Sequence, residues 1–451
     1  YRAEGVFLGG IGARTRREPL EMNMVKPIQV NEKETLGFAN LYRTGRKAPV
    51  WEQALVTVWF FVTYLPLDGV TPIRYLLVLY FLGITAMYYR DVAPVILKSW
   101  PLFLLPIFGL LSFMWSDYPS DAIRAGVLLL LTPLTIVVVG ARLNTRQALR
   151  CLMFAGMITT IFAIPTFSTF SQGGPYGNGA KNLFAIQMLF AMLLSLATAL
   201  NPKEFLWVRL LALPFVPVCF VFQYMAHSAT SLVFAVVGII GLLGVRYFWM
   251  GLGQIRYLRT SLLMASVGIA LTGAIVFLSM PENTIMDDFL GLLGKDGTFS
   301  GRSAIWRQAE LLSHEHPIAG VGLEGFWQYD VGAAQTINEN DFKPFGTKLT
   351  FHNSFWEVRV HLGYIGYALF LLILGWCLYR TVLAWFRAPT MDSSALLITA
   401  VIIFTSTFTE SYLWGTFNTL VNLFYFGAIT TLGAGERKFE GRVPITVRET
   451  S

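Results

Sequence analysis

The sequence is dominated by long segments that are apolar almost throughout. A helix of about 20 apolar residues spans the hydrocarbon core of a bilayer, which is about 30 Å thick. Twelve segments approach that length, at 50–67, 73–89, 99–116, 122–141, 148–168, 182–200, 206–226, 230–249, 260–280, 356–379, 394–413 and 416–434. Each is continuously apolar, which favours helices over the alternating strands of a membrane barrel. The sequence therefore predicts an all-α, polytopic membrane protein with about 12 transmembrane helices.

The composition supports the same fold class. The chain is 55% hydrophobic and 14% charged, whereas soluble domains are roughly 25% charged. In water it would expose large apolar patches, which excludes a soluble enzyme, a disordered regulator and a coiled coil. The net charge of +7 is assigned to basic cytoplasmic loops and not to nucleic-acid binding. The three cysteines lie singly in apolar runs and form no metal or disulfide pattern.

The distribution of lysine and arginine predicts the orientation. If the chain begins in the cytoplasm, 25 of the 34 basic residues flank the cytoplasmic ends of the spans and 9 lie on the other side. This bias places both termini inside. The predicted organisation is a cytoplasmic N-terminal segment (1–49), spans one to nine (50–280), a periplasmic cap loop (281–355), spans ten to twelve (356–434) and a cytoplasmic tail (435–451).

The loop 281–355 is too long for a simple connector. It carries ten acidic and five basic residues and contains a helical pattern over 303–312, with Ile305, Ala309 and Leu312 on one face. His316-Pro317 and the glycines from Gly320 onward end that pattern. The sequence predicts a small ordered cap on the outer face of the membrane.

Four residues on the predicted outer side could bind an anion. Arg302 and Arg307 lie where basic residues are scarce, and guanidinium groups bind phosphate oxygens bidentately. The alternative is ordinary pairing with acidic residues of the same loop. Lys181 and Asn182 begin a span after a glycine-rich stretch, and helix N-termini favour anions. The alternative there is a flexible loop with an interfacial lysine.

Two further residues could carry proton chemistry. His352 lies just before a predicted span and could accept a proton from a hydroxyl, or it could simply cap that helix. Glu410 lies near the predicted outer end of a span, where a carboxylate is costly and is functional or paired. Such polar residues cluster at the outer face and not deep in the spans, which favours an enzyme over a transporter.

Several short motifs occur in a characteristic order. They are Trp115-Ser116-Asp117, Gly301-Arg302 with Trp306, His316-Pro317 followed by Gly320-Val321-Gly322, His352-Asn353-Ser354-Phe355, Leu362-Gly363-Tyr364-Ile365-Gly366 and Thr409-Glu410-Ser411. The ordered set, between about residues 100 and 434, resembles the superfamily of O-antigen ligases and Wzy-type polysaccharide polymerases. Within it, the chain is most similar to exopolysaccharide polymerases of the ExoQ type.

The resemblance implies a GT-C-like glycosyltransferase of the bacterial inner membrane that is metal-independent, inverting and free of cofactors. Such enzymes use a glycan carried on undecaprenyl diphosphate at the periplasmic face. Polymerases transfer it to another lipid-linked repeat unit, whereas ligases transfer it to lipid A–core. The implied partners are the lipid-linked donor and acceptor, the bilayer, and flippase and chain-length regulator proteins.

The resemblance also implies residue roles. Arg302 would hold the diphosphate leaving group, and His352 would orient or deprotonate the acceptor hydroxyl. From their own positions, we expect Glu410 to share the catalytic work of His352 and Asn353, beside His352, to bind the substrate. The sequence departs from the family in the turn 226–230, where many members carry a basic residue and this chain has His227. The second diphosphate contact would then come from Lys181 or His227.

Overall fold

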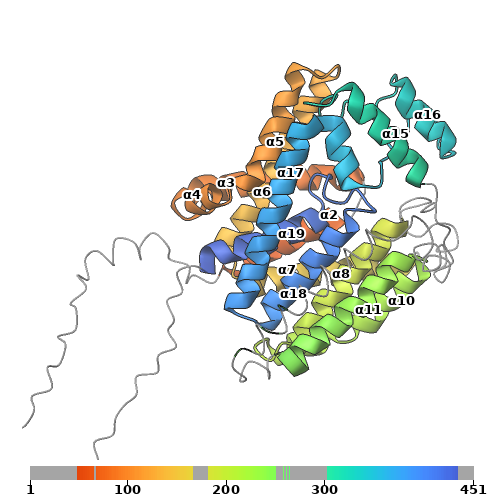
Figure 1. Cartoon of the computed structure of the whole chain (residues 1–451). Coiled ribbons are helices and arrows are strands. Elements are labelled where there is room, and N and C mark those ends of the chain that lie inside the picture. The colour runs from red at the N-terminus through yellow and green to blue at the C-terminus, as the bar shows by residue number, and fades with distance from the viewer. Residues whose placement is uncertain are drawn as a thin grey trace, which may run out of the picture. The chain divides into compact units, whose positions relative to one another are not determined.

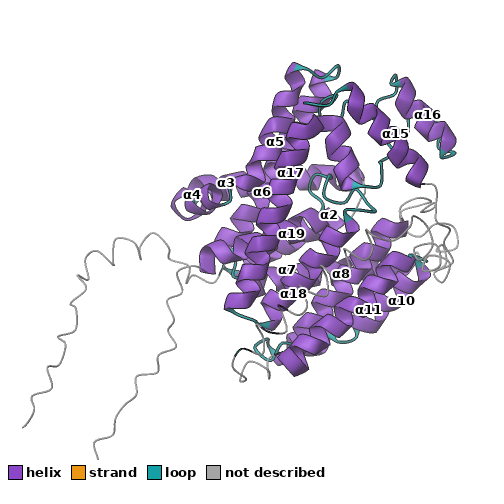
Figure 2. Ribbon diagram, viewed as in Figure 1, coloured by secondary structure: helices purple, strands orange, loops and turns teal. Residues whose placement is uncertain are grey.

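The computed structural model describes residues 48–64, 68–165, 181–249 and 302–434, with the single residues 257, 261 and 264. Within these residues every regular element is helical, as predicted, and Figure 2 shows no strand among them. The predicted ninth span at 260–280 lies outside the described residues apart from 261 and 264, as do the N-terminal segment apart from 48 and 49, and the tail.

The helices of the predicted transmembrane segments begin with α2 (Val50–Tyr64), α3 (Thr71–Met87), α4 (Tyr89–Lys98) and α5 (Pro101–Leu111). They continue with α6 (Pro119–Arg142), α7 (Thr145–Ala163), α8 (Lys181–Leu200), α9 (Leu206–Ala212), α10 (Phe215–Met225) and α11 (Ala229–Gly244). They end with α17 (Ser354–Arg387), α18 (Met391–Ser406) and α19 (Thr419–Ala434). Two further helices, α15 (Arg302–Glu315) and α16 (Gly332–Asn340), belong to the predicted cap.

Five helical segments in the described residues are long and apolar enough to cross a membrane: α6, α8, α9 with α10, α11 with its π-helical end, and α17. A sixth arises if α3 and α4, which meet at a bend of 103°, form one broken span. Shorter apolar helices occupy Pro101–Met114, Met391–Ser406 and Thr419–Thr430. The chain is thus a multi-pass membrane protein, and the total of twelve spans stays a prediction.

Helix α8 forms the centre of the bundle. In its most apolar window 78% of the residues are buried, against 22% in α11 and 28% in the α9–α10 pair. It packs against α7, α10, α11 and α18, and Figure 1 shows α10 and α11 side by side along it. Because α8 is enclosed, its first turn has a defined position, whereas the outer sides of α10 and α11 are apolar and exposed.

The cap has a small hydrophobic core of its own. Ile305 and Ala309 of α15 pack with Phe326, Trp327 and Phe351, so the predicted helical face is confirmed. α15 also packs on α17. The cap further contacts the chain between α5 and α6, where the Leu323 amide donates to Ser112 Oγ at 2.9 Å and the Trp115 ring donates to the Ala319 carbonyl.

Helix α17 is broken near its start. Gly363 has φ 62°, and an added Cβ would lie 2.4 Å from the Ile318 backbone. The opposing Gly320 has φ 67° and an equally close approach to the His361 backbone. Two chain segments therefore cross where only glycine fits, and the amide of Tyr364 donates to the Pro317 carbonyl at 2.8 Å. This crossing joins the cap to the first turns of α17.

Candidate functional site

Glu410 lies in the loop that joins α18 to α19. The sequence predicted a span over 394–413, but α18 ends at Ser406. The backbone beyond that helix is bonded to the start of α17: the Ser354 amide donates to the Thr407 carbonyl at 3.0 Å, and Asn353 Nδ2 donates to the Phe408 carbonyl at 3.0 Å. These bonds satisfy carbonyls that would otherwise need another helical turn. Glu410 is consequently held outside the helix.

Three side chains from separate elements contact the Glu410 carboxylate. Arg302, the first residue of α15, donates to Oε1 at 2.6 Å and also bonds the Thr409 carbonyl. Asn182, in the first turn of α8, donates to the same oxygen at 2.9 Å. His352 Nδ1 lies 3.2 Å from Oε2. The structure thus brings together four residues that the sequence singled out.

The surroundings of Glu410 determine which nitrogen carries the proton when the imidazole of His352 is neutral. Burial raises the pKa of Glu410, but the hydrogen bond from His352 and the charge of Arg302 outweigh it and hold the pKa below its usual range. The carboxylate is therefore ionised near neutrality and can only accept hydrogen bonds. We assign the proton of His352 to Nδ1 on this ground, which leaves the Nε2 lone pair able to accept a proton.

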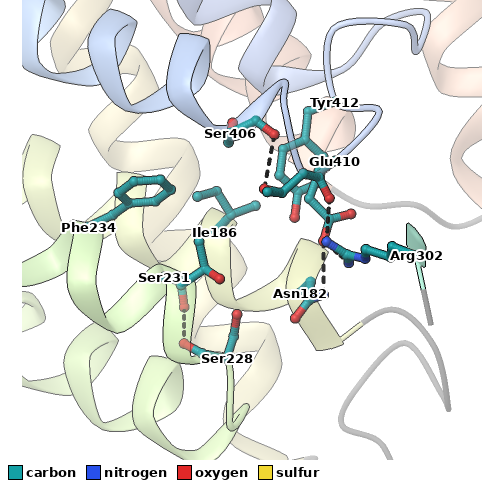
Figure 3. Close-up of a pocket in the computed structure, with 11 residues that line it drawn as sticks. Asn182, Ile186, Ser228, Ser231, Phe234, Arg302, Ser406, Glu410 and Tyr412 are labelled. Atoms are coloured by element: carbon teal, nitrogen blue, oxygen red, sulfur yellow. Dashed lines mark hydrogen bonds and ion pairs between the residues drawn. The ribbon is translucent and has the colours of Figure 1, made fainter. Parts of the chain in front are cut away.

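A pocket opens beside this cluster. Figure 3 shows Arg302, Asn182 and Glu410 meeting at one side of it, with Ile186 and Phe234 on the other. Its hydroxyl groups come from Ser228, Thr230, Ser231, Ser406, Thr409 and Tyr412. Residues at the N-termini of α8 and α11 line it, and helix N-termini attract negative charge. The pocket is suited to an anionic group attached to an apolar one.

The remaining predicted residues lie around this centre. Asn353 is the N-cap of α17 and accepts from the Phe355 amide at 2.9 Å, so it orients the backbone next to His352. Lys181 and His227 are exposed and directly precede the lining residues Asn182 and Ser228. Arg307 is exposed on α15 and does not line the pocket. The two arginines, predicted alike, are thus separated by the structure.

Sequence reasoning missed Glu357, a buried carboxylate in the first turn of α17. An acidic residue at a helix start is common because it favours the helix dipole, so its type and position alone gave no reason to single it out. Its role depends on contacts with three segments that the sequence does not place together.

The comparisons with known proteins concern the middle of the chain. Residues 214–371 match a family described as O-antigen ligase. That range includes Arg302 and His352 and lies between Asn182 and Glu410. The exopolysaccharide production protein ExoQ of Rhizobium meliloti (strain 1021) is 24% identical over 288 residues, which are 60% of this chain.

The matched region spans 63% of ExoQ, which is less than two thirds of that protein. Both findings agree with the ordered motifs, and the resemblance predicted from them is confirmed: this chain resembles the superfamily of O-antigen ligases and Wzy-type polymerases and lies close to ExoQ.

Proposed function

We propose that this protein is a glycosyltransferase of the bacterial inner membrane that polymerises oligosaccharide repeat units linked to undecaprenyl diphosphate. The observation that carries the proposal is the convergence of Arg302, Asn182 and His352 on Glu410 beside a pocket that hydroxyl groups line together with Ile186 and Phe234. The reaction takes place at the periplasmic face, with both termini in the cytoplasm and residues 281–355 outside.

The donor half of the reaction requires stabilisation of a diphosphate leaving group. Arg302 supplies a guanidinium at the pocket, and the N-termini of α8 and α11 supply backbone dipoles that favour anions. Arg302 is held by the Thr409 carbonyl and by Glu410. These two bonds orient the guanidinium, so little reorganisation is needed when negative charge develops.

The acceptor half requires removal of a hydroxyl proton. His352 Nε2 takes that proton while the acceptor oxygen attacks the anomeric carbon of the donor sugar. The bond from that carbon to the phosphate oxygen breaks, and its electron pair leaves with the diphosphate. Attack opposite the leaving group inverts the anomeric configuration. Glu410 stabilises the imidazolium formed on His352, as a carboxylate does in other His–carboxylate pairs.

The apolar wall suggests where the lipid tail lies. Phe234 belongs to α11, whose outer side exposes Val236, Val237 and Ile240. A polyprenyl chain attached to a diphosphate in the pocket could follow this side of α11 into the bilayer. The similarity to ExoQ, an exopolysaccharide production protein, favours a polymerase. The matching family description favours the alternative, a ligase that transfers the glycan to lipid A–core.

Reconstitution distinguishes these activities. Purified protein in liposomes is supplied with undecaprenyl-diphosphate-linked repeat units extracted from the source bacterium. A polymerase produces a ladder whose bands differ by one repeat unit. A ligase produces a new glycolipid only after lipid A–core is added, and a transporter moves the substrate without forming a bond. His352→Ala should reduce product formation by roughly 100- to 10,000-fold. A wild-type ladder from that variant would refute the proposed role of His352.

A further inference from the structure

Glu357 is buried close to the site but does not line the pocket. Its carboxylate is 1% exposed. Oε1 accepts from the Phe351 amide at 2.6 Å and from Ser411 Oγ at 3.2 Å, and Oε2 accepts from the Trp327 ring at 3.4 Å. A buried carboxylate is costly unless such donors compensate it.

The groups bonded to Glu357 lie on both sides of His352. Phe351 precedes His352 directly. Ser411, which follows Glu410, accepts through its hydroxyl from the Asn353 amide at 3.1 Å, and Asn353 follows His352. One carboxylate therefore bonds the backbone before His352 directly and the backbone after it through Ser411. It also connects the segment of His352 to the segment of Glu410.

His352 needs such support because its backbone is strained. Its φ is 49°, in the left-handed region that is unfavourable for a residue with a side chain. Such a conformation persists only where the surrounding structure enforces it. The bonds through Glu357 and Ser411 are suited to this task, because they hold the two neighbouring peptide groups and leave the imidazole directed toward Glu410.

A second histidine completes the arrangement. His361 Nδ1 lies 3.2 Å from the Gly322 carbonyl, which can only accept, so Nδ1 carries a proton. Its Nε2 then faces Glu357 Oε2 at 3.6 Å. This separation is longer than a hydrogen bond, so the two atoms are neighbours without a direct bond. The His361 ring also stacks on Trp414, with centroids 5.2 Å apart.

We infer that Glu357 is a positioning residue, which sets the orientation of His352 toward Glu410 through the Phe351 amide and Ser411. The inference rests on the proposed function. It places the effect of Glu357 on turnover and not on binding of the donor, because neither Glu357 nor Ser411 lines the pocket that contains Arg302.

The test compares two variants of Glu357 with a matched control. Glu357→Ala removes the acceptor for both the Phe351 amide and Ser411 Oγ. It should lower the initial rate at saturating donor by about 100-fold, the lower range for loss of an acid–base group. Affinity for undecaprenyl diphosphate alone, the probe for donor binding, should change by less than about threefold. Glu357→Gln should retain most of the rate, since its carbonyl oxygen can accept from the Phe351 amide and from Ser411, while its NH₂ faces His361 Nε2 and gives up only the long bond from the Trp327 ring.

Glu52 provides the control. It is also 1% exposed and lies in the first turn of a helix, where it pairs with Arg142 at 2.8 Å. Arg142 ends the 24-residue helix α6, which is about 36 Å long and whose other end meets the cap. Glu52→Ala measures what loss of a buried glutamate does to folding.

Ser411→Ala removes only the connection from Glu357 to the Asn353 amide. It should lower the rate by about tenfold, within the range of a single lost hydrogen bond.

A double variant separates positioning from general damage. If Glu357 acts through His352, adding Glu357→Ala to His352→Ala should lower the rate no further. Wild-type turnover by Glu357→Ala would overturn the inference. So would a double variant that is slower than His352→Ala alone, or a Glu357→Gln variant as slow as Glu357→Ala. If Glu357→Ala fails to fold, wild-type turnover by Ser411→Ala overturns it. An active His352→Ala would instead refute the proposed role of His352 as the base, and absence of product from the wild type would refute the proposed function.

Discussion

Replacing Glu410 by glutamine tests the centre of the site, because no orientation of the amide satisfies its neighbours. In the wild type, Oε1 accepts from Arg302 and Asn182, and Oε2 accepts from His352 Nδ1. If the glutamine oxygen takes the place of Oε1, its NH₂ faces Nδ1 and forces that nitrogen to become an acceptor. The imidazole proton then moves to Nε2, which can no longer take a proton from the acceptor hydroxyl.

The magnitude follows from the burial of the pair. The side chains of Arg302 and Glu410 are 17% and 13% exposed. Stranding a fully buried charge costs about 3–5 kcal/mol, but in this variant Arg302 retains the Thr409 carbonyl and a neutral acceptor. We therefore expect Glu410→Gln to lower the free energy of unfolding by about 1–1.5 kcal/mol, the difference between charged and neutral hydrogen bonds. The rate should fall by roughly 100- to 10,000-fold, since the base is in the wrong tautomer.

The assay is the initial rate of product formation in liposomes, together with thermal unfolding in detergent and binding of undecaprenyl diphosphate. Glu324→Gln is the matched control, because Glu324 pairs with Lys348 at 3.4 Å on the exposed side of the cap. That exposed pair contributes about 0–1 kcal/mol, so the control should behave as wild type. If Glu410→Gln kept more than half of the wild-type rate, the assignment of Nε2 as the base would be refuted.

Three further predictions concern charge, pH and topology. Arg302→Ala should abolish product formation, and Arg302→Lys should also be poor because an ammonium lacks the bidentate fork; full activity of the lysine variant would show that a point charge is sufficient. The pKa of Glu410 is lowered from the usual 4.5, so the difference in unfolding temperature between wild type and Glu410→Gln should be constant above pH 4.5 and shrink only as the pH falls below it; shrinkage already at pH 6 would contradict the lowered pKa. Ala333, exposed on α16, changed to cysteine should react with an impermeant thiol reagent in intact spheroplasts, since the native Cys151, Cys219 and Cys377 are buried; reaction only after permeabilisation would place residues 281–355 in the cytoplasm.

The sequence by itself determined the helical class and several of the site residues. Apolar runs near the length of a bilayer can satisfy their backbone only as helices, so α6, α8 and α11 were predictable from local pattern. Arg302 and Glu410 could be identified because isolated charges beside apolar segments are energetically costly and are usually paired or functional. The cap helix α15 was predictable from the spacing of Ile305 and Ala309.

Tertiary structure decided which of these residues meet. Asn182 and Glu410 are 228 residues apart, and no local pattern specifies that the start of α8 faces the loop after α18. Arg302 and Arg307 have similar surroundings in the sequence, but five residues of helix direct them to different sides. Packing of Ile305 and Ala309 into the cap determines which arginine reaches the pocket. The break at Gly363 and the role of Glu357 likewise depend on segments that cross in space, because hydrophobic pattern selects which residues are buried but not their partners.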